Sequence, residues 1–477
     1  MEQNRKLLGS RRARLAACIA ATFGFAAAPV AFCATTVTSC ADDGSPGTLR
    51  YAVLTADEGG SVDAAGLQCS VITLQSGAIN VDENSLTIMG PGAAKLVVDA
   101  GQHSRAFFHG GTGTLSLDGM TIANGHVGGD RALGGCIYSK NSIGLTDTVV
   151  TGCTAQGVHY GGGGGGVLAF GNLVMTGSIV ENNLAESSAG TAATGSAIGG
   201  GVVVVGKLTM FQSRISGNHA HANGGFALGG GAYVISGVEA KYSTFDDNLG
   251  DVAAFDAANS FASAGALALG RNAPPTTFDM RSCTVAHNRA DVAGGMFLSG
   301  QSTDKSTIYN STISMNAANY EGGGLAVGTR MTIFNSTIAF NTSGSYGAGG
   351  MFAEGDTLRL ESTIIADNSP SGMYAADLDG SAVLSGHNDL VKLVGSGMTL
   401  PAGTLRSDPH LGPLQDNGGT THTQALMPDS PAIDAGNNTA GFIYDQRFTG
   451  FKRVVGGSAD IGAFEYDPDI IFVNGFN

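Results

Sequence analysis

The sequence predicts an all-β protein, a right-handed parallel β-helix with a short N-terminal capping helix and an irregular C-terminal cap. The composition is the first reason: glycine supplies 75 of 477 residues, charged residues only 13% and hydrophobic residues 43%. Average domains contain ~7% glycine and ~25% charged residues. This bias indicates many short strands between tight turns, because disordered chains lack such apolar content. Two recurring motifs, one ending in Asn and one containing Gly-Gly, are the other reasons.

The Asn-ended motif has apolar residues at positions 0, +2 and +7, a small polar residue at +5 and Asn at +10. The stretch LTMFQSRISGN (208–218) shows it, and variants recur along most of the chain. Asparagines at the same corner of successive coils can bond to the backbone and to the Asn above and below, and Asn tolerates the left-handed conformation of a sharp corner. The predicted ladder consists of Asn183, Asn218, Asn248, Asn288, Asn316, Asn341 and Asn368.

The glycine motif precedes a strand-like run, as in GGGVVVV (199–205), GGGAYVI (229–235) and GGMFL (294–298). Both motifs recur every 25 to 40 residues, and a period of this length indicates a stacked architecture. The period-2 segments of three to five residues are too short for helical repeats. We therefore expect three short strands per coil, coils ~4.8 Å apart, and apolar side chains directed into a central core.

The two ends of the chain lack the repeat. A basic N-terminus followed by LAACIAATFGFAAAPVAF (15–32) predicts a cleaved signal peptide over residues 1–34, with a single membrane anchor as the alternative. SPGTLRYAVLTADEG (45–59) predicts a capping helix, because Leu49, Ala52 and Val53 share one face. Residues 35–394 then form the β-helix with its N-terminal cap, and residues 395–477 form a capping or anchor-like segment.

Five cysteines remain after removal of the signal peptide, in what is predicted to be an oxidising compartment. We expect one disulfide between Cys40 and Cys69 and a second between Cys136 and Cys153, which leaves Cys283 free. Cys136 follows a glycine pair and Cys153 replaces a ladder Asn, so the second bond would staple one coil.

The motifs resemble those of two groups of exported proteins. FDDN (245–248) and the Gly-Gly motifs resemble repeats of chlamydial polymorphic outer-membrane proteins. VTSCADDGSPGTLRYAV (37–53) and the tail elements DPHLGPLQDNGG, SPAIDAG and DIGAFE between 408 and 465 resemble exported bacterial β-helix proteins with a choice-of-anchor Q region. IIFVNGFN (470–477) resembles a short GF-ending tail found on many exported bacterial proteins, and this resemblance implies a sorting tag. These resemblances imply an adhesin-like protein on the extracellular or outer-membrane surface of a Gram-negative bacterium.

Long connections follow three successive ladder residues and leave the same corner, so we expect them to lie side by side. Insertions on one face of a stacked protein often bind ligands. Aromatic residues beside carboxylates could hold a sugar there, whereas inert Ala-, Ser- and Gly-rich decoration is the alternative. The candidate binding residues are Glu186, His219, His221, Phe226, Asp251, Phe255, Asp256 and Phe261.

A polysaccharide lyase or glycoside hydrolase of the pectin lyase-like fold is the alternative function, and only a lyase would need calcium. Its catalytic candidates are Asp246, Asp247, Asp251, Asp279 and Arg281. His219 and His221 have the H-x-H spacing of a metal pair, but no third ligand lies near them in sequence. The sequence therefore predicts no metal site and no cofactor.

The favoured function is non-enzymatic: an exported β-helix that displays loops for adhesion or contact with glycans or other cell-surface components. The net charge of −15 and the lack of a basic cluster argue against nucleic acid as a partner, and no stretch after the signal peptide is apolar enough to span a bilayer.

Overall fold

The computed structural model describes residues 34–469, except 189–194, 254–259, 271–276, 300–304, 345–346, 356 and 371–375. The predicted signal peptide, apart from Ala34, and the predicted tail at 470–477 lie outside these residues. Within the described part of the chain, no helix combines the length and hydropathy of a membrane span.

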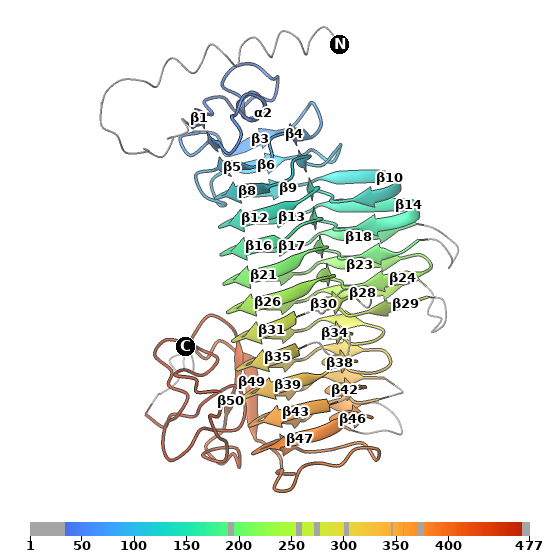
Figure 1. Cartoon of the computed structure of the whole chain (residues 1–477), viewed down its shortest axis with the longest axis vertical. Coiled ribbons are helices and arrows are strands. Elements are labelled where there is room, and N and C mark those ends of the chain that lie inside the picture. The colour runs from blue at the N-terminus through green and yellow to red at the C-terminus, as the bar shows by residue number, and fades with distance from the viewer. Residues whose placement is uncertain are drawn as a thin grey trace.

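The chain forms a parallel β-helix, which confirms the predicted fold class (Figure 1). Successive coils pair in parallel along four sheets, and each regular coil visits them in the order III, I, II and IV. Sheets I, II, III and IV contain 13, 12, 11 and 12 strands over the described residues.

Sheets I and II supply two walls of the core. Sheet I consists of β1 (Thr35–Thr36), β2 (Ser61–Asp63), β5 (Leu86–Met89), β8 (Thr114–Asp118), β12 (Ser142–Thr146), β16 (Leu173–Thr176), β21 (Lys207–Phe211), β26 (Gly237–Lys241), β31 (Thr277–Arg281), β35 (Lys305–Tyr309), β39 (Met331–Phe334), β43 (Thr357–Glu361) and β47 (Val383–His387). Sheet II consists of β3 (Val71–Thr73), β6 (Val97–Asp99), β9 (Thr121–Ala123), β13 (Val149–Thr151), β17 (Ile179–Glu181), β22 (Arg214–Ser216), β27 (Thr244–Asp246), β32 (Thr284–Ala286), β36 (Thr312–Ser314), β40 (Thr337–Ala339), β44 (Ile364–Ala366) and β48 (Leu390–Val391).

Sheet III is the third wall, and sheet IV lies beyond the corner formed by the ladder asparagines. Sheet III consists of β4 (Ile79–Val81), β7 (Phe107–His109), β11 (Ile137–Ser139), β15 (Val167–Ala169), β20 (Val202–Val204), β25 (Ala232–Val234), β30 (Leu267–Leu269), β34 (Met296–Leu298), β38 (Leu325–Val327), β42 (Met351–Ala353) and β46 (Leu378–Gly380). Sheet IV consists of β10 (His126–Leu133), β14 (Thr154–Gly163), β18 (Leu184–Ser187), β19 (Ala197–Ile198), β23 (His219–Ala222), β24 (Phe226–Leu228), β28 (Leu249–Val252), β29 (Phe261–Ser263), β33 (Arg289–Ala290), β37 (Ala317–Ala318), β41 (Thr342–Ser343) and β45 (Ser369–Pro370).

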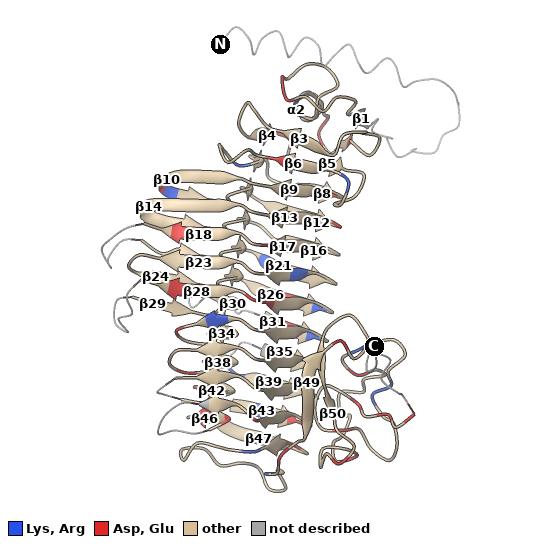
Figure 2. Ribbon diagram, turned by 180° about the vertical axis from the view of Figure 1, so that it is seen from behind, with Lys and Arg blue, Asp and Glu red and all other residues tan. Residues whose placement is uncertain are grey.

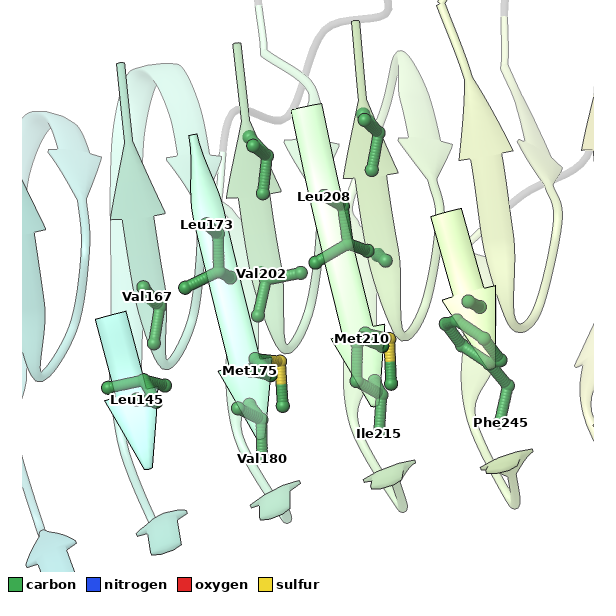
Figure 3. Packing of buried hydrophobic residues seen from close by; sticks show 14 of the residues in the cluster. Leu145, Val167, Leu173, Met175, Val180, Val202, Leu208, Met210, Ile215 and Phe245 are labelled. Carbon is green, nitrogen blue, oxygen red and sulfur yellow. The ribbon is translucent and has the colours of Figure 1, made fainter. Parts of the chain in front are cut away.

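The core is built from columns of apolar side chains, one per coil, because the strands stack in register. Leu208 pairs with Leu173 on one side and Val238 on the other, and Ile215 lies between Val180 and Phe245 (Figure 3). All of these side chains are buried. Burial of each contributes about 1.5–3 kcal/mol, so the repeat of apolar positions stabilises every coil in the same way.

The ladder asparagines form one hydrogen-bonded column. Asn183 Nδ2 donates to Asn218 Oδ1 at 2.9 Å, and Asn218 Nδ2 donates to Asn248 Oδ1 at 3.0 Å. The same contact continues through the later members as far as Asn368, whose amide donates to Asp377 Oδ1 at 3.0 Å. Each amide also donates to a backbone carbonyl, so these buried polar groups are satisfied without water.

Glycines close each coil against this column. A Cβ on Gly201 would lie 2.9 Å from Asn218 Cγ, and one on Gly200 would lie 2.4 Å from the His219 carbonyl oxygen. The start of a sheet III strand therefore touches the end of the same coil's sheet II segment. Seventeen positions separate these landmarks in four coils: Gly166–Asn183, Gly201–Asn218, Gly231–Asn248 and Gly324–Asn341. The connection from Asn to the next glycines lies outside the closed coil, which explains why its length varies.

The N-terminal end carries the predicted helix, α2 (Leu49–Leu54). Thr48 caps it by accepting a hydrogen bond from the Tyr51 backbone N–H, and Leu49, Ala52 and Val53 are buried. Both predicted disulfides, Cys40–Cys69 and Cys136–Cys153, are present, and Cys283 is free and buried.

The C-terminal segment covers the last coil and then continues along the side of the β-helix. Met398 packs against the end of the core. The chain then forms an antiparallel pair, β49 (Leu411–Gln415) and β50 (Thr423–Leu426), and runs beside sheet II (Figure 1). Thr312 Oγ1 donates to Gln446 Oε1 at 2.6 Å, and Thr337 Oγ1 accepts from the Ala463 N–H at 3.0 Å.

Asp389 is a buried carboxyl group before β48. Its Oδ1 accepts from the Thr363 N–H at 2.9 Å, whereas Oδ2 has no hydrogen-bond partner among the described residues. Burial raises the pKa of Asp389 to about 8, because the charged form loses its hydration.

The raised pKa predicts a pH-dependent effect of Asp389→Asn. The folded protein holds this proton more tightly than the unfolded chain, whose pKa is about 3.9. The stabilising contribution is therefore complete below about pH 4 and is lost as the pH rises to about 8. We expect the variant to match the parent protein in Tm at pH 4 and to exceed it at pH 9. Thermal melting across this range tests the prediction, and Asp57→Asn, at an exposed carboxyl, is the control. A constant Tm difference would contradict it.

Candidate functional site

The three long connections lie side by side and form a two-layered projection, which we call the fin. Strands β18, β23 and β28 lead outward as one layer, and β19, β24 and β29 return as the other. Parallel pairing joins neighbouring strands within each layer. The arrangement agrees with the expectation that these connections leave the same corner.

Alanines form the interior of the fin. In β23 and β24, Ala220, Ala222 and Ala227 are buried, whereas the residues that alternate with them are partly exposed. The small side chains fit a thin space between two layers, so the alanines of these connections form a core of their own. The buried cluster consists of Ala197, Ala220, Ala222, Ala227, Ala262 and Ala290.

The two outer faces of the fin differ in chemistry. Alternate residues of a strand point to opposite sides, so His219 and His221 point away from the alanines on the outward layer. Phe226 and Phe261 point away from them on the returning layer. The aromatic and polar residues that the sequence suggested as one sugar site therefore lie on opposite faces of the fin. Phe255 and Asp256 lie outside the described residues.

The aromatic face of the fin meets sheet III in an apolar groove of about 540 Å³. Phe226 and Phe261 form one wall, with ring centroids 5.0 Å apart and the planes inclined by 69°. On sheet III, Ala268 stands in register between Tyr233 and Phe297, so a small side chain between two aromatic ones makes the hollow.

A few polar groups line this groove. Ser263 is buried, and its Oγ has no hydrogen-bond partner among the described residues. Burial raises the pKa of Tyr233, whose side chain also lines the groove. Sequence reasoning identified Phe226 and Phe261 but missed the sheet III residues, because these occupy ordinary outward positions of the repeat and only the register shows that they face the fin.

The opposite face of the fin carries a cluster of two histidines and a carboxylate. Asp251 Oδ1 lies 2.8 Å from His219 Nε2 and 2.7 Å from His221 Nδ1. Burial acts to raise the pKa of Asp251, but the hydrogen bonds from both histidines outweigh it and hold that pKa below its usual value. Glu186 stands in register with His221 on the preceding coil and accepts from Gln156 Nε2 at 3.0 Å. Figure 2 shows acidic residues on β18 and β28 of this face.

The catalytic candidates do not form one cluster. Asp246 lies on sheet II and forms an ion pair with Arg214, and Asp247 occupies the following corner with φ of 55°. Asp279 lies on sheet I, 3.1 Å from Arg281. Asp251 belongs to sheet IV.

Glu239 is the register partner of Asp279 on the neighbouring strand of sheet I, and it forms ion pairs with two lysines. It lies 2.5 Å from Lys207 Nζ and 2.7 Å from Lys241 Nζ. The hydrogen bond from Lys207, followed by that from Lys241, lowers the pKa of Glu239 to about 2. On sheet I, Glu239 and Asp279 therefore stand in register on neighbouring coils, each beside a basic partner, whereas Asp246 is paired with Arg214 on sheet II.

The fold defines the class of the protein as a parallel β-helix. No family model matches the chain, and no curated protein matches it. Among solved structures, the crystal structure of the pectate lyase Pel9A aligns over 92% of this chain and 98% of that chain, with 13% sequence identity and a TM-score of 0.41. This likeness concerns the fold alone. The resemblance to choice-of-anchor and chlamydial repeat proteins stays a prediction.

Proposed function

We propose that the protein is an exported, non-enzymatic β-helix that binds a glycan in the groove between the fin and sheet III. The aromatic lining of the groove is the observation that carries the proposal. Sugar rings have apolar C–H faces that pack on aromatic rings, and the volume of about 540 Å³ lies within the range of small-molecule sites, ~300–1,000 Å³. From Tyr233 to Phe297 the groove covers two strand spacings, about 10 Å.

The two disulfides support export, because disulfides persist in oxidising compartments.

The separation of the catalytic candidates favours binding without reaction. A lyase of this class needs several acids and a base around one sugar unit, whereas Asp246, Asp251 and Asp279 lie on three different sheets. We expect incubation with acidic polysaccharides, with and without calcium, to release no unsaturated products absorbing in the ultraviolet. Product formation would establish the enzymatic alternative.

Substitutions in the groove test the binding directly. Phe226→Ala should weaken binding about tenfold, because an aromatic contact contributes about 0.5–1.5 kcal/mol and 1.4 kcal/mol is a factor of ten. Ala268→Phe should abolish binding by filling the hollow. Affinity electrophoresis against a panel of purified polysaccharides measures both effects.

The matched control for these substitutions is Phe352→Ala. Phe352 is an outward aromatic residue of the same sheet III face, and it does not line the groove. Its replacement should leave retardation unchanged. Absence of retardation by every polysaccharide, or full retardation of Ala268→Phe, would overturn the proposal.

A further inference from the structure

We propose that His219, His221 and Asp251 form a binding site for one transition-metal ion of the Zn²⁺ type on the polar face of the fin. The site is independent of the glycan proposal, because it lies on the opposite face from the groove. The H-x-H spacing supplies two of the ligands in sequence, but the third, Asp251, follows 30 residues after His221.

The architecture of the β-helix brings the three donors together. His219 and His221 are two positions apart on β23 and therefore project from the same side of the strand. Asp251 is the register partner of His221 on β28, in the next coil. One donor atom of each residue lies within 4.8 Å of the other two.

The geometry requires only a small adjustment to accept a metal ion. Both imidazoles converge on the same oxygen, at 2.8 Å and 2.7 Å, and their rings are inclined by 62°. With Zn²⁺ bonds of ~2.0–2.1 Å in tetrahedral geometry, ligand atoms lie about 3.4 Å apart. Each contact must therefore lengthen by about 0.6 Å, which side-chain rotation can provide. The ion then takes the place of the imidazole N–H hydrogens that donate hydrogen bonds to Asp251 Oδ1.

The surroundings hold the donors and leave one side open. Buried Ala220 anchors the strand between the two histidines. The side chains of His219, His221 and Asp251 are 35%, 30% and 43% exposed, so solvent can reach the fourth coordination position. Glu186, next in the column, adds a second negative charge near the site. A divalent cation bound by one carboxylate and two neutral imidazoles keeps a net positive charge. The negative charge of Glu186 partly offsets it.

The donor set selects the class of metal. Imidazole nitrogen suits Zn²⁺, Cu²⁺, Ni²⁺ and Fe²⁺, whereas Ca²⁺ and Mg²⁺ require oxygen ligands. Calcium, the ion expected for a lyase, should therefore not bind at these residues. A bound ion would also link β23 to β28 and stabilise the outward layer of the fin, because a ligand that binds only the folded state raises its stability.

Isothermal titration of the metal-free protein with ZnCl₂ tests the site. We expect one Zn²⁺ per chain and no heat of binding with CaCl₂ at the same concentration. Titration with CoCl₂ should give the visible absorption of a nitrogen- and oxygen-coordinated cobalt ion. The variants His221→Asn and Asp251→Asn should each lose at least the 10- to 100-fold in affinity typical of losing an outer-shell partner.

The control is His159→Asn. His159 on β14 lies 2.8 Å from Asp130 on β10. This pair reproduces a histidine–aspartate contact without a second histidine. Zn²⁺ affinity of this variant should equal that of the parent protein, and melting curves without metal should show that all variants fold. Absence of Zn²⁺ binding by the parent protein, or equal binding by the folded His221→Asn variant, would overturn the proposal.

Discussion

Replacement of Asn218 by alanine is expected to lower the free energy of unfolding by about 3–5 kcal/mol. Asn218 Oδ1 accepts from the backbone N–H of Asn183 at 3.1 Å and from its amide at 2.9 Å. Asn218 Nδ2 donates to the Val180 carbonyl at 2.9 Å and to Asn248 at 3.0 Å. Truncation leaves these partners buried without a replacement, and each such group costs about 1–3 kcal/mol.

Urea unfolding followed by circular dichroism measures this effect. Asn223→Ala is the matched control, because Asn223 lies exposed in the turn between β23 and β24. Its replacement should change stability by less than about 0.5 kcal/mol, as is usual for surface positions. Similar midpoints for the two variants would show that the ladder contributes little to stability.

Gly200→Ala should destabilise the protein by about 3 kcal/mol or more. A Cβ at this position would lie 2.3 Å from the Gly230 carbonyl oxygen and 2.4 Å from that of His219. Both are backbone atoms of packed coils, so no side-chain rotation can relieve the contact. The coil would have to open at its corner, and overpacking of a tight interior costs about 1–3 kcal/mol or more.

Gly66→Ala is the matched control for the glycine corner. No atom lies within 4 Å of a Cβ built on Gly66, and its backbone does not adopt a positive φ. Alanine there should be neutral, or stabilise by about 0.4–1 kcal/mol by restricting the unfolded chain. The Tm values of the Gly200→Ala and Gly66→Ala variants are compared by thermal melting. Equal values would contradict the prediction, because they would show that the coils have room for a Cβ at the corner.

The sequence contained enough to predict the fold because the β-helix repeats its chemistry. Apolar residues such as Leu208 and Ile215 recur at fixed offsets from Asn218, and stacking places each above its equivalent. The ladder and the Cys136–Cys153 disulfide follow from the same pattern, whereas the Cys40–Cys69 disulfide and the buried face of α2 with Leu49 were predicted from the N-terminal segment outside the repeat. Because many coils share the same pattern of residues, a departure from the pattern in a single coil does not hide the repeat.

The sites were less accessible to sequence reasoning because they depend on the non-repeating connections. The proximity of these connections was predictable, but their folding into two layers was not, since the returning strands have only two or three residues. The position of Asp251 beside His221 depends on the register between coils. The groove depends on Ala268, whose small size matters only because larger residues flank it.

The closed corner of each coil separates folding from recognition along the chain. Since Gly200 and Gly201 meet Asn218 and His219 directly, the connection that runs from Asn218 to the glycines of the next coil can be shortened, extended or exchanged without altering the core. Mutations in these stretches are thereby freed from the constraint of maintaining the scaffold. A lineage built on this plan can acquire a new binding partner by exchanging a short insertion, while the inherited framework stays unchanged.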